Sequence, residues 1–112
     1  GIDMSKITVT TIAGQTSGGD ANKVKIESGD DLEVVSGDLT VDTNTLHVNA
    51  TDNRVGIGTT SPSYPLTISH ASTAYHHSTN GTAQSIFGVD AANTNILGSI
   101  SNHDMRFITN TT

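Results

Sequence analysis

The five histidines, His47, His70, His76, His77 and His103, are the side chains of this sequence that could bind a metal or transfer a proton near neutral pH. His76 and His77 are adjacent, and adjacent residues of a strand face opposite ways, so only one of the two imidazoles can reach a common site. That imidazole could still bind a metal on the symmetry axis of an assembly, together with the same imidazole of the other copies. A solvated polar loop is the simpler interpretation, and we predict neither a metal nor another cofactor.

The Gly-Ile-Gly motif at residues 56–58 begins like the phosphate-binding loop of dinucleotide-binding proteins. Such a loop needs a third glycine and a following helix, but Ser61 occupies the glycine position and Pro62 prevents the helix. We interpret Gly56 and Gly58 instead as positions where another backbone approaches too closely for a Cβ. The Asp-Thr-Asn segment at residues 42–44 begins like a calcium loop but lacks the later oxygen ligand and glycine, so we interpret it as a turn.

Catalysis is not indicated by any spacing of nucleophiles or acids. Serine, histidine and aspartate are all present, but no strand-turn-helix context presents a serine nucleophile. The adjacent carboxylates Asp30 and Asp31 lie in a predicted turn, whereas glycoside hydrolysis needs two carboxylates across a cleft. We predict that the chain is not an enzyme.

Charge and hydrophobicity argue against two further classes. The chain has 5 basic and 11 acidic residues, a net charge of −6, and its basic residues are scattered, so no surface follows a phosphate backbone. No apolar run approaches the length of a membrane span. We therefore predict neither nucleic-acid binding nor membrane insertion.

The composition predicts strands, turns and too small a core. Thr, Ser, Asn and Gly are nearly half of the 112 residues, which is typical of an all-β fold. Ordering such a chain costs on the order of 170 kcal/mol, and offsetting this needs about 7,000 Å² of apolar burial. Ile, Leu, Val and Phe are only about a fifth of the residues, and without Cys no disulfide can help. We expect the missing burial to come from other chains.

A seven-residue repeat of Leu-x-Val is the clearest internal order. Its three copies begin at Leu32, Leu39 and Leu46, and turn-forming residues precede each copy. Residues at i and i+2 share one face of a strand but lie on opposite sides of a helix, so the repeat predicts short strands and not a coiled coil. A rung with two apolar residues needs neighbours in its own chain or in partner chains.

Shifts in composition divide the chain into four parts, at residues 1–3, 4–27, 28–68 and 69–112. The first part precedes a Met and is interpreted as a cloning remnant. The second is predicted to hold N-terminal strands, at residues 4–12 and 24–26, around a Gly-rich linker. The third is a β-repeat stalk, in which Pro62 and Pro65 bend the chain before a Leu-x-Ile rung.

The fourth part is predicted to be a small antiparallel β-meander. Residues 84–89, 95–99 and 105–108 read as its three strands. Residues 70–82 are polar and are interpreted as a loop, with a hairpin-turn signal at Asn80-Gly81. Because the sequence ends just after the last predicted strand, we expect this part to be truncated.

The run Val-Gly-Ile-Gly-Thr-x-x-Pro at residues 55–62, followed by Leu-x-Ile at residues 66–68, resembles a repeat of phage tail fibre and tailspike proteins. Residues 102–110 are similar to the strand that closes the next small β-domain of such fibres. Residues 4–12 are similar to the N-termini of fibre proteins of marine and cyanobacterial phages. The resemblance implies a homotrimeric, fibrous stalk related to β-helices, with the meander as its head.

The implied function is structural and adhesive: a virion protein, made in the host cytoplasm, that presents a receptor-binding surface for host attachment. Its partners would be other copies of the chain, other virion proteins, and a host glycan or protein. Tyr75, His76 and His77 are candidate receptor contacts, because aromatic rings stack on sugars. The trimer core would be lined by Leu32, Val34, Leu39, Val41, Leu46, Val48, Val55, Ile57, Leu66 and Ile68. A non-catalytic part of a carbohydrate-degrading tailspike, and a capsid fibre or decoration protein, are the alternatives.

Overall fold

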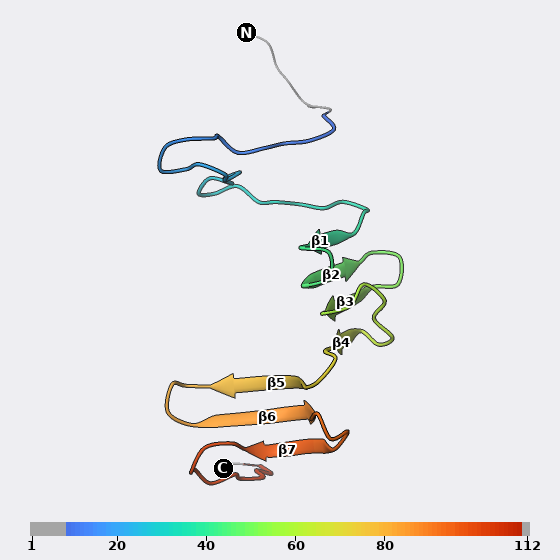
Figure 1. The fold of residues 1–112 in the computed structure, drawn as a ribbon, viewed down its shortest axis with the longest axis vertical. Coiled ribbons are helices and arrows are strands. Elements are labelled where there is room, and N and C mark those ends of the chain that lie inside the picture. The colour runs from blue at the N-terminus through green and yellow to red at the C-terminus, as the bar shows by residue number, and fades with distance from the viewer. Residues whose placement is uncertain (1–8, 111–112) are drawn as a thin grey trace. The chain divides into compact units, whose positions relative to one another are not determined.

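The computed structural model describes residues 9–110, and its strands form two sheets (Figure 1). This part of the chain contains no helix, which confirms the all-β fold class. Accordingly, no helix that could cross a membrane occurs among these residues. The chain divides into two units after Glu33. The predicted cloning remnant and residues 4–8 of the first predicted strand lie outside the described residues.

The described part of the first unit, residues 9–33, contains no strand. Its main feature is a loop that closes where the Asn22 amide donates to the Gln15 carbonyl at 2.6 Å. The strands predicted at residues 9–12 and 24–26 are therefore wrong. Their apolar side chains are 49–70% exposed, and only Val24 and Ile26 alternate with a polar residue, since Val9 and Ile12 lie three residues apart. Among the described residues of the unit, no neighbouring strand satisfies their backbone groups.

Sheet A holds four short strands, β1 (Leu39–Val41), β2 (Leu46–Asn49), β3 (Arg54–Ile57) and β4 (Leu66–Ile68). The second and third Leu-x-Val units form the antiparallel hairpin of β1 and β2, β3 pairs antiparallel with β2, and β4 pairs parallel with β3. The first Leu-x-Val unit, at residues 32–34, is not a strand.

Sheet B is an antiparallel meander of β5 (Ala74–Thr79), β6 (Gln84–Val89) and β7 (Asn95–Ser99). Strands β6 and β7 have the predicted bounds, but the strand predicted at residues 105–108 is wrong, because that segment has no pairing partner. The predicted loop at residues 70–82 is also wrong, since it contains β5. A tight turn, in which the Ala83 amide donates to Asn80 Oδ1 at 2.9 Å, brings β5 beside β6.

Little of the chain is buried by its own fold. Among residues 9–110, the buried residues are Ile86 at 4% exposure, His47 at 6%, Gly56 and Pro62. The described residues therefore form no hydrophobic core of the usual size.

Candidate functional site

The apolar residues of the rungs gather on one face of sheet A. The register aligns Leu39, Val48, Val55 and Leu66 across the four strands, and Val41, Leu46, Ile57 and Ile68 beside them. Residues directly opposite one another in a sheet point to the same side. Eight of the ten predicted core residues thus form one surface, called here the apolar face of sheet A.

The other face of sheet A is the one that the chain covers. Its central row is Thr40, His47, Gly56 and Thr67. The crossover from β3 to β4 lies over this face, where the Arg54 guanidinium donates to the carbonyl of the buried Pro62 at 3.1 Å. Most antiparallel sheets bury the apolar face and expose the polar one, so sheet A is built the other way round.

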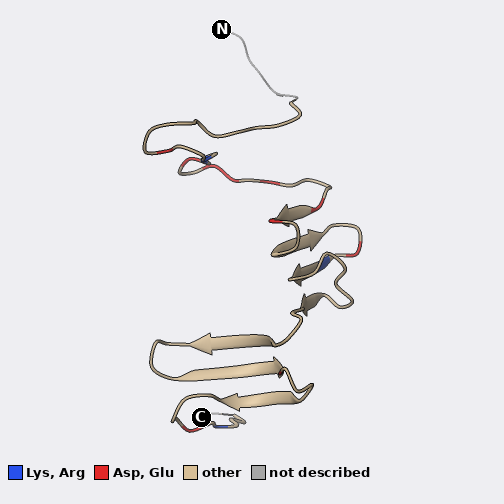
Figure 2. Ribbon diagram, in the orientation of Figure 1, with Lys and Arg blue, Asp and Glu red and all other residues tan. Residues whose placement is uncertain are grey.

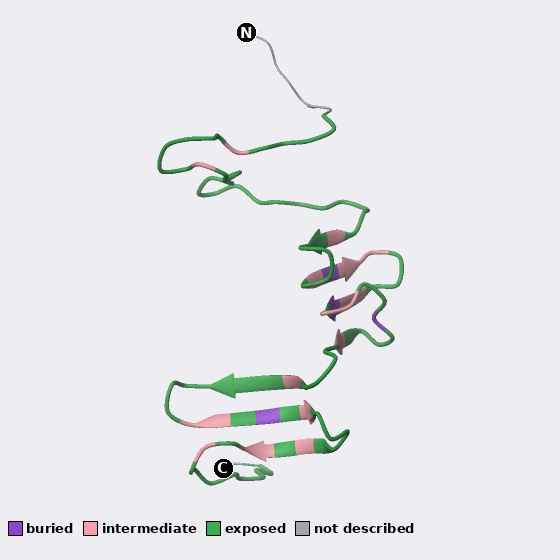
Figure 3. Ribbon diagram, viewed as in Figure 1, coloured by how far each residue is buried: buried purple, intermediate pink, exposed green. Residues whose placement is uncertain are grey.

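The apolar face of sheet A remains open as a consequence. Val41, Ile57 and Leu66 are 45%, 42% and 57% exposed, and the other five residues of this face are half-buried. Figure 3 shows the same distribution: burial is confined to short stretches of β2, β3, β6 and the crossover. The two remaining predicted core residues, Leu32 and Val34, are 70% and 45% exposed and belong to no sheet.

Gly56 and Gly58 both lie against other backbone of the same chain. A Cβ on Gly56 would collide with the Thr59 carbonyl oxygen, and a Cβ on Gly58 with the Ser69 carbonyl oxygen. Gly58 also has a φ of 79°, a conformation that favours glycine. These contacts fix the start of the crossover close to sheet A.

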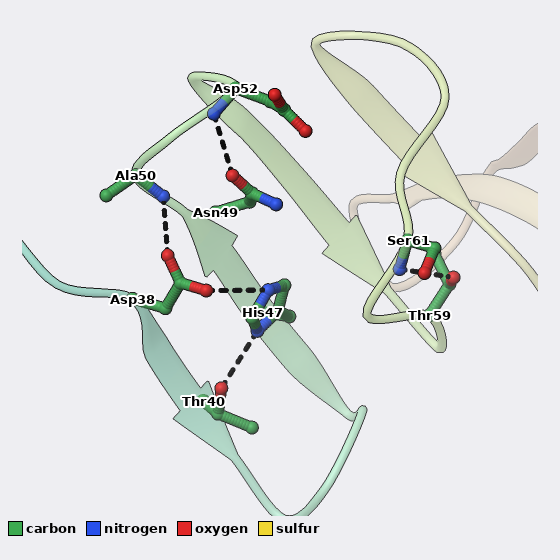
Figure 4. A network of polar contacts seen from close by, with 8 residues as sticks. All are labelled: Asp38, Thr40, His47, Asn49, Ala50, Asp52, Thr59 and Ser61. Atoms are coloured by element: carbon green, nitrogen blue, oxygen red, sulfur yellow. Dashed lines mark hydrogen bonds and ion pairs between the residues drawn. The ribbon is translucent and has the colours of Figure 1, made fainter.

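A hydrogen-bonded network surrounds His47 (Figure 4). Its Nδ1 lies 2.8 Å from Thr40 Oγ1, and its Nε2 lies 3.4 Å from Asp38 Oδ2. The other carboxylate oxygen of Asp38 accepts the Ala50 amide at 2.8 Å. A hydroxyl, an imidazole and a carboxylate are therefore connected in series.

Thr40, His47 and Asp38 are connected in the order of a catalytic triad, but their surroundings are those of a contact that stabilises the fold. Neither of the two hollows described below is lined by Thr40, and the carboxylate of Asp38 is partly engaged by a backbone amide. A nucleophile would also need oxyanion donors beside the reacting atom. The network instead joins β1 to β2 on the covered face. Its sequence signal was available, because Thr40 and His47 hold the middle position of successive Leu-x-Val units.

Tyr75, His76 and His77 lie on β5 and not on a loop, and they do not share a face. Tyr75 pairs with Gly88 and His77 with Ile86, whereas His76 points to the other side, opposite Phe87. His77 Nε2 lies 3.1 Å from Gln84 Oε1, and His76 Nε2 lies 3.1 Å from Ser78 Oγ. The structure therefore does not bring the three side chains into one receptor site.

Two hollows lie on the second unit. One, of about 260 Å³, has a lining that includes Ser78, Asn80, Gln84, His103 and Asp104. The other, of about 330 Å³, lies where β4 of sheet A adjoins β5 and β6 of sheet B and is lined mainly by apolar residues of these strands. Within residues 9–110, no group of three His, Cys, Asp or Glu side chains could hold a metal ion.

Comparisons of the chain with protein-family models, with curated proteins and with solved structures find no match. The interpretation of the site therefore depends on its own geometry. The feature that most needs explanation is the apolar face of sheet A, which the chain leaves open.

Proposed function

We propose that this chain is a segment of a phage tail fibre, a homotrimeric stalk and head that presents a receptor-binding surface to a host cell. The observation that carries the proposal is the inverted sheet A. Its polar face is covered by the crossover, whereas Val41, Ile57 and Leu66 on its apolar face remain 42–57% exposed within residues 9–110. A second and a third copy of the same chain would cover these residues.

The first Leu-x-Val unit supports the same proposal. Residues 31–35 have no strand partner among the residues that the structure describes, and Leu32, Val34 and Val35 are 70%, 45% and 83% exposed. In the proposed assembly this segment pairs with neighbouring copies and completes the stalk. The stalk acts mechanically, because three copies of the head at one tip raise the avidity for a cell surface.

Solution mass tests the proposal directly. Light scattering on the 112-residue chain should give a mass near three times 11.6 kDa. Val41→Asp places a charge on the apolar face of sheet A and should reduce the mass to that of one chain. The matched control is Ser63→Asp, which adds the same charge on the exposed crossover and should remain trimeric.

Two results would contradict the proposal. One is a wild-type chain that is monomeric at all concentrations tested. The other is a Val41→Asp variant that is soluble and trimeric, with the circular dichroism of the wild type, since an assembly through the apolar face of sheet A could not accommodate that carboxylate.

A further inference from the structure

One face of sheet B carries a second group of exposed apolar side chains. The register places Phe87 between His76 and Leu97, and Val89 beside Ala74. Phe87, Val89 and Leu97 are 65%, 39% and 57% exposed. These residues define the apolar face of sheet B.

The opposite face of sheet B is apolar at its centre too. Ile86, which follows the alternation of β6 to that side, is 4% exposed, and Ile96 of β7 is half-buried on the same side. A strand with one solvent-exposed face alternates apolar and polar residues. Strand β6 instead has apolar residues on both faces, with Ile86 on one side and Phe87 and Val89 on the other. Strands that are apolar on both sides are typical of sheets covered on both faces.

The apolar faces of the two sheets are continuous. The hollow of about 330 Å³ is lined by Leu66 and Ile68 of sheet A and by Ala74, Phe87 and Val89 of sheet B, with His76 at the same site. Since β4 adjoins β5, one surface runs from the rungs to the meander. Copies that cover the apolar face of sheet A are therefore placed to cover the face of sheet B as well.

The charge distribution favours a second copy as the occupant. Each chain has a net charge of −6, yet residues 55–89 contain no Lys, Arg, Asp or Glu. Figure 2 shows this region, from β4 to β6, without charged residues. Acidic copies repel each other least along an uncharged surface, and the centres of protein interfaces are depleted in charged residues.

We propose that the apolar face of sheet B is a self-association surface, occupied by the same face of neighbouring copies. Contacts between the apolar faces of sheet B then hold the heads of the copies together, in addition to the contacts between their stalks. This inference rests on the proposed homotrimer and extends the shared surface beyond Ile68, where the predicted core ends.

Site-directed cross-linking tests the inference, because the chain has no Cys. Leu97→Cys puts one thiol per chain on the proposed surface, and a short bismaleimide should then link two copies. Ala92→Cys, in the exposed turn between β6 and β7, is the matched control. In a trimer the thiols at both positions are confined, but only thiols that face each other across a contact lie within the reach of a short linker, so we expect linked copies at position 97 and a loss of linking at position 92.

Phe87→Ser provides a second measurement on the intact chain. It removes the largest exposed side chain of the surface and should shift the monomer–trimer equilibrium toward monomer at low micromolar concentration. A trimeric wild type with no cross-link at position 97 and an unshifted Phe87→Ser variant would overturn this inference and leave the proposed function standing. A monomeric wild type would overturn both. Cross-linking at position 97 in an assembly of two copies would support the surface and overturn the trimer.

Discussion

The first and second Leu-x-Val units have the same apolar residues and different structures. Leu39–Val41 is strand β1, because the turn after it folds the chain back and β2 satisfies its backbone groups. Residues 32–34 form no strand, and Leu32 is 70% exposed. The pattern therefore determines which residues can pair, whereas the connection determines whether the partner lies in the same chain.

The two connections differ in what their aspartates bind. After β1, Asp42 has a φ of 49° and Thr43 a φ of 60°, and the Thr45 hydroxyl donates to Asp42 Oδ2 at 3.0 Å, so the chain reverses within four residues. After the first unit, Asp38 binds the Ala50 amide and His47 instead. The carboxylate of Asp38 stabilises the hairpin of β1 and β2. It does not form a turn that would fold residues 32–34 back onto this hairpin.

The largest expected effect is at the centre of the hairpin. His47→Ala removes a buried imidazole and its contacts with Thr40 and Asp38, and should lower the free energy of unfolding by about 2–4 kcal/mol. Urea denaturation followed by circular dichroism measures this. His103→Ala, at an exposed imidazole, is the control and should change the free energy by less than about 0.5 kcal/mol. Equal effects at the two positions would show that the network does not hold β1 on β2.

Leu32→Ala and Leu39→Ala compare the two units with the same substitution. If neighbouring copies supply the strand that residues 31–35 lack, both variants lose apolar burial. Each should then lower the free energy of unfolding by about 1–2 kcal/mol, less than at a fully buried site. Because assembly is linked to folding, both effects should depend on protein concentration. If Leu32→Ala lowers the free energy of unfolding by less than about 0.5 kcal/mol while Leu39→Ala has the expected effect, residues 32–34 remain unpaired in solution.

Asp38 allows a smaller test of the second connection. Asp38→Ala removes both of its contacts and should cost about 1 kcal/mol, a modest value because the side chain is 44% exposed. Asp38→Asn keeps an oxygen for the Ala50 amide and loses only the negative charge beside His47, so it should cost about half as much. Thermal unfolding of the two variants in parallel separates the contributions. If both unfold like the wild type, Asp38 plays no part in the hairpin.

Much of sheet A could be predicted from the sequence because its apolar residues recur at i and i+2 and its turns are rich in Asn, Asp and Gly. The same rule produced the errors at residues 24–26 and 105–108, where a period-2 pattern occurs without a partner strand. Strand β5 was missed for the opposite reason. It has few apolar side chains, and its signal was the Asn80-Gly81 turn that pairs it with β6. The alternation of apolar and polar residues is a property of one segment, whereas strand formation also requires a second segment that pairs with it.

The site was predictable to a similar extent. Eight rung residues share one face because the register of the hairpin follows from its turn, and that much could be predicted from the spacing. That this face is the open one could not be predicted, because it depends on where the crossover after Gly58 lies. The sequence interpretation placed Tyr75, His76 and His77 on a loop, so it did not predict that Tyr75 and His77 lie on one face of β5 and His76 on the other.

The smallest effect is expected in the turn that distinguishes the second unit from the first. Thr43 is β-branched and has a φ of 60°, a left-handed conformation that β-branched residues adopt with strain and asparagine adopts readily. Thr43→Asn should therefore raise the free energy of unfolding by about 0.5 kcal/mol, measured by urea denaturation. The control is Thr45→Asn, which removes the hydroxyl that binds Asp42 and should instead lower it. A Thr43→Asn variant less stable than the wild type would contradict this geometry of the turn. A higher free energy of unfolding would show that the turn after β1 limits the stability of the pairing between β1 and β2. The Leu-x-Val copy at residues 32–34 has no such pairing.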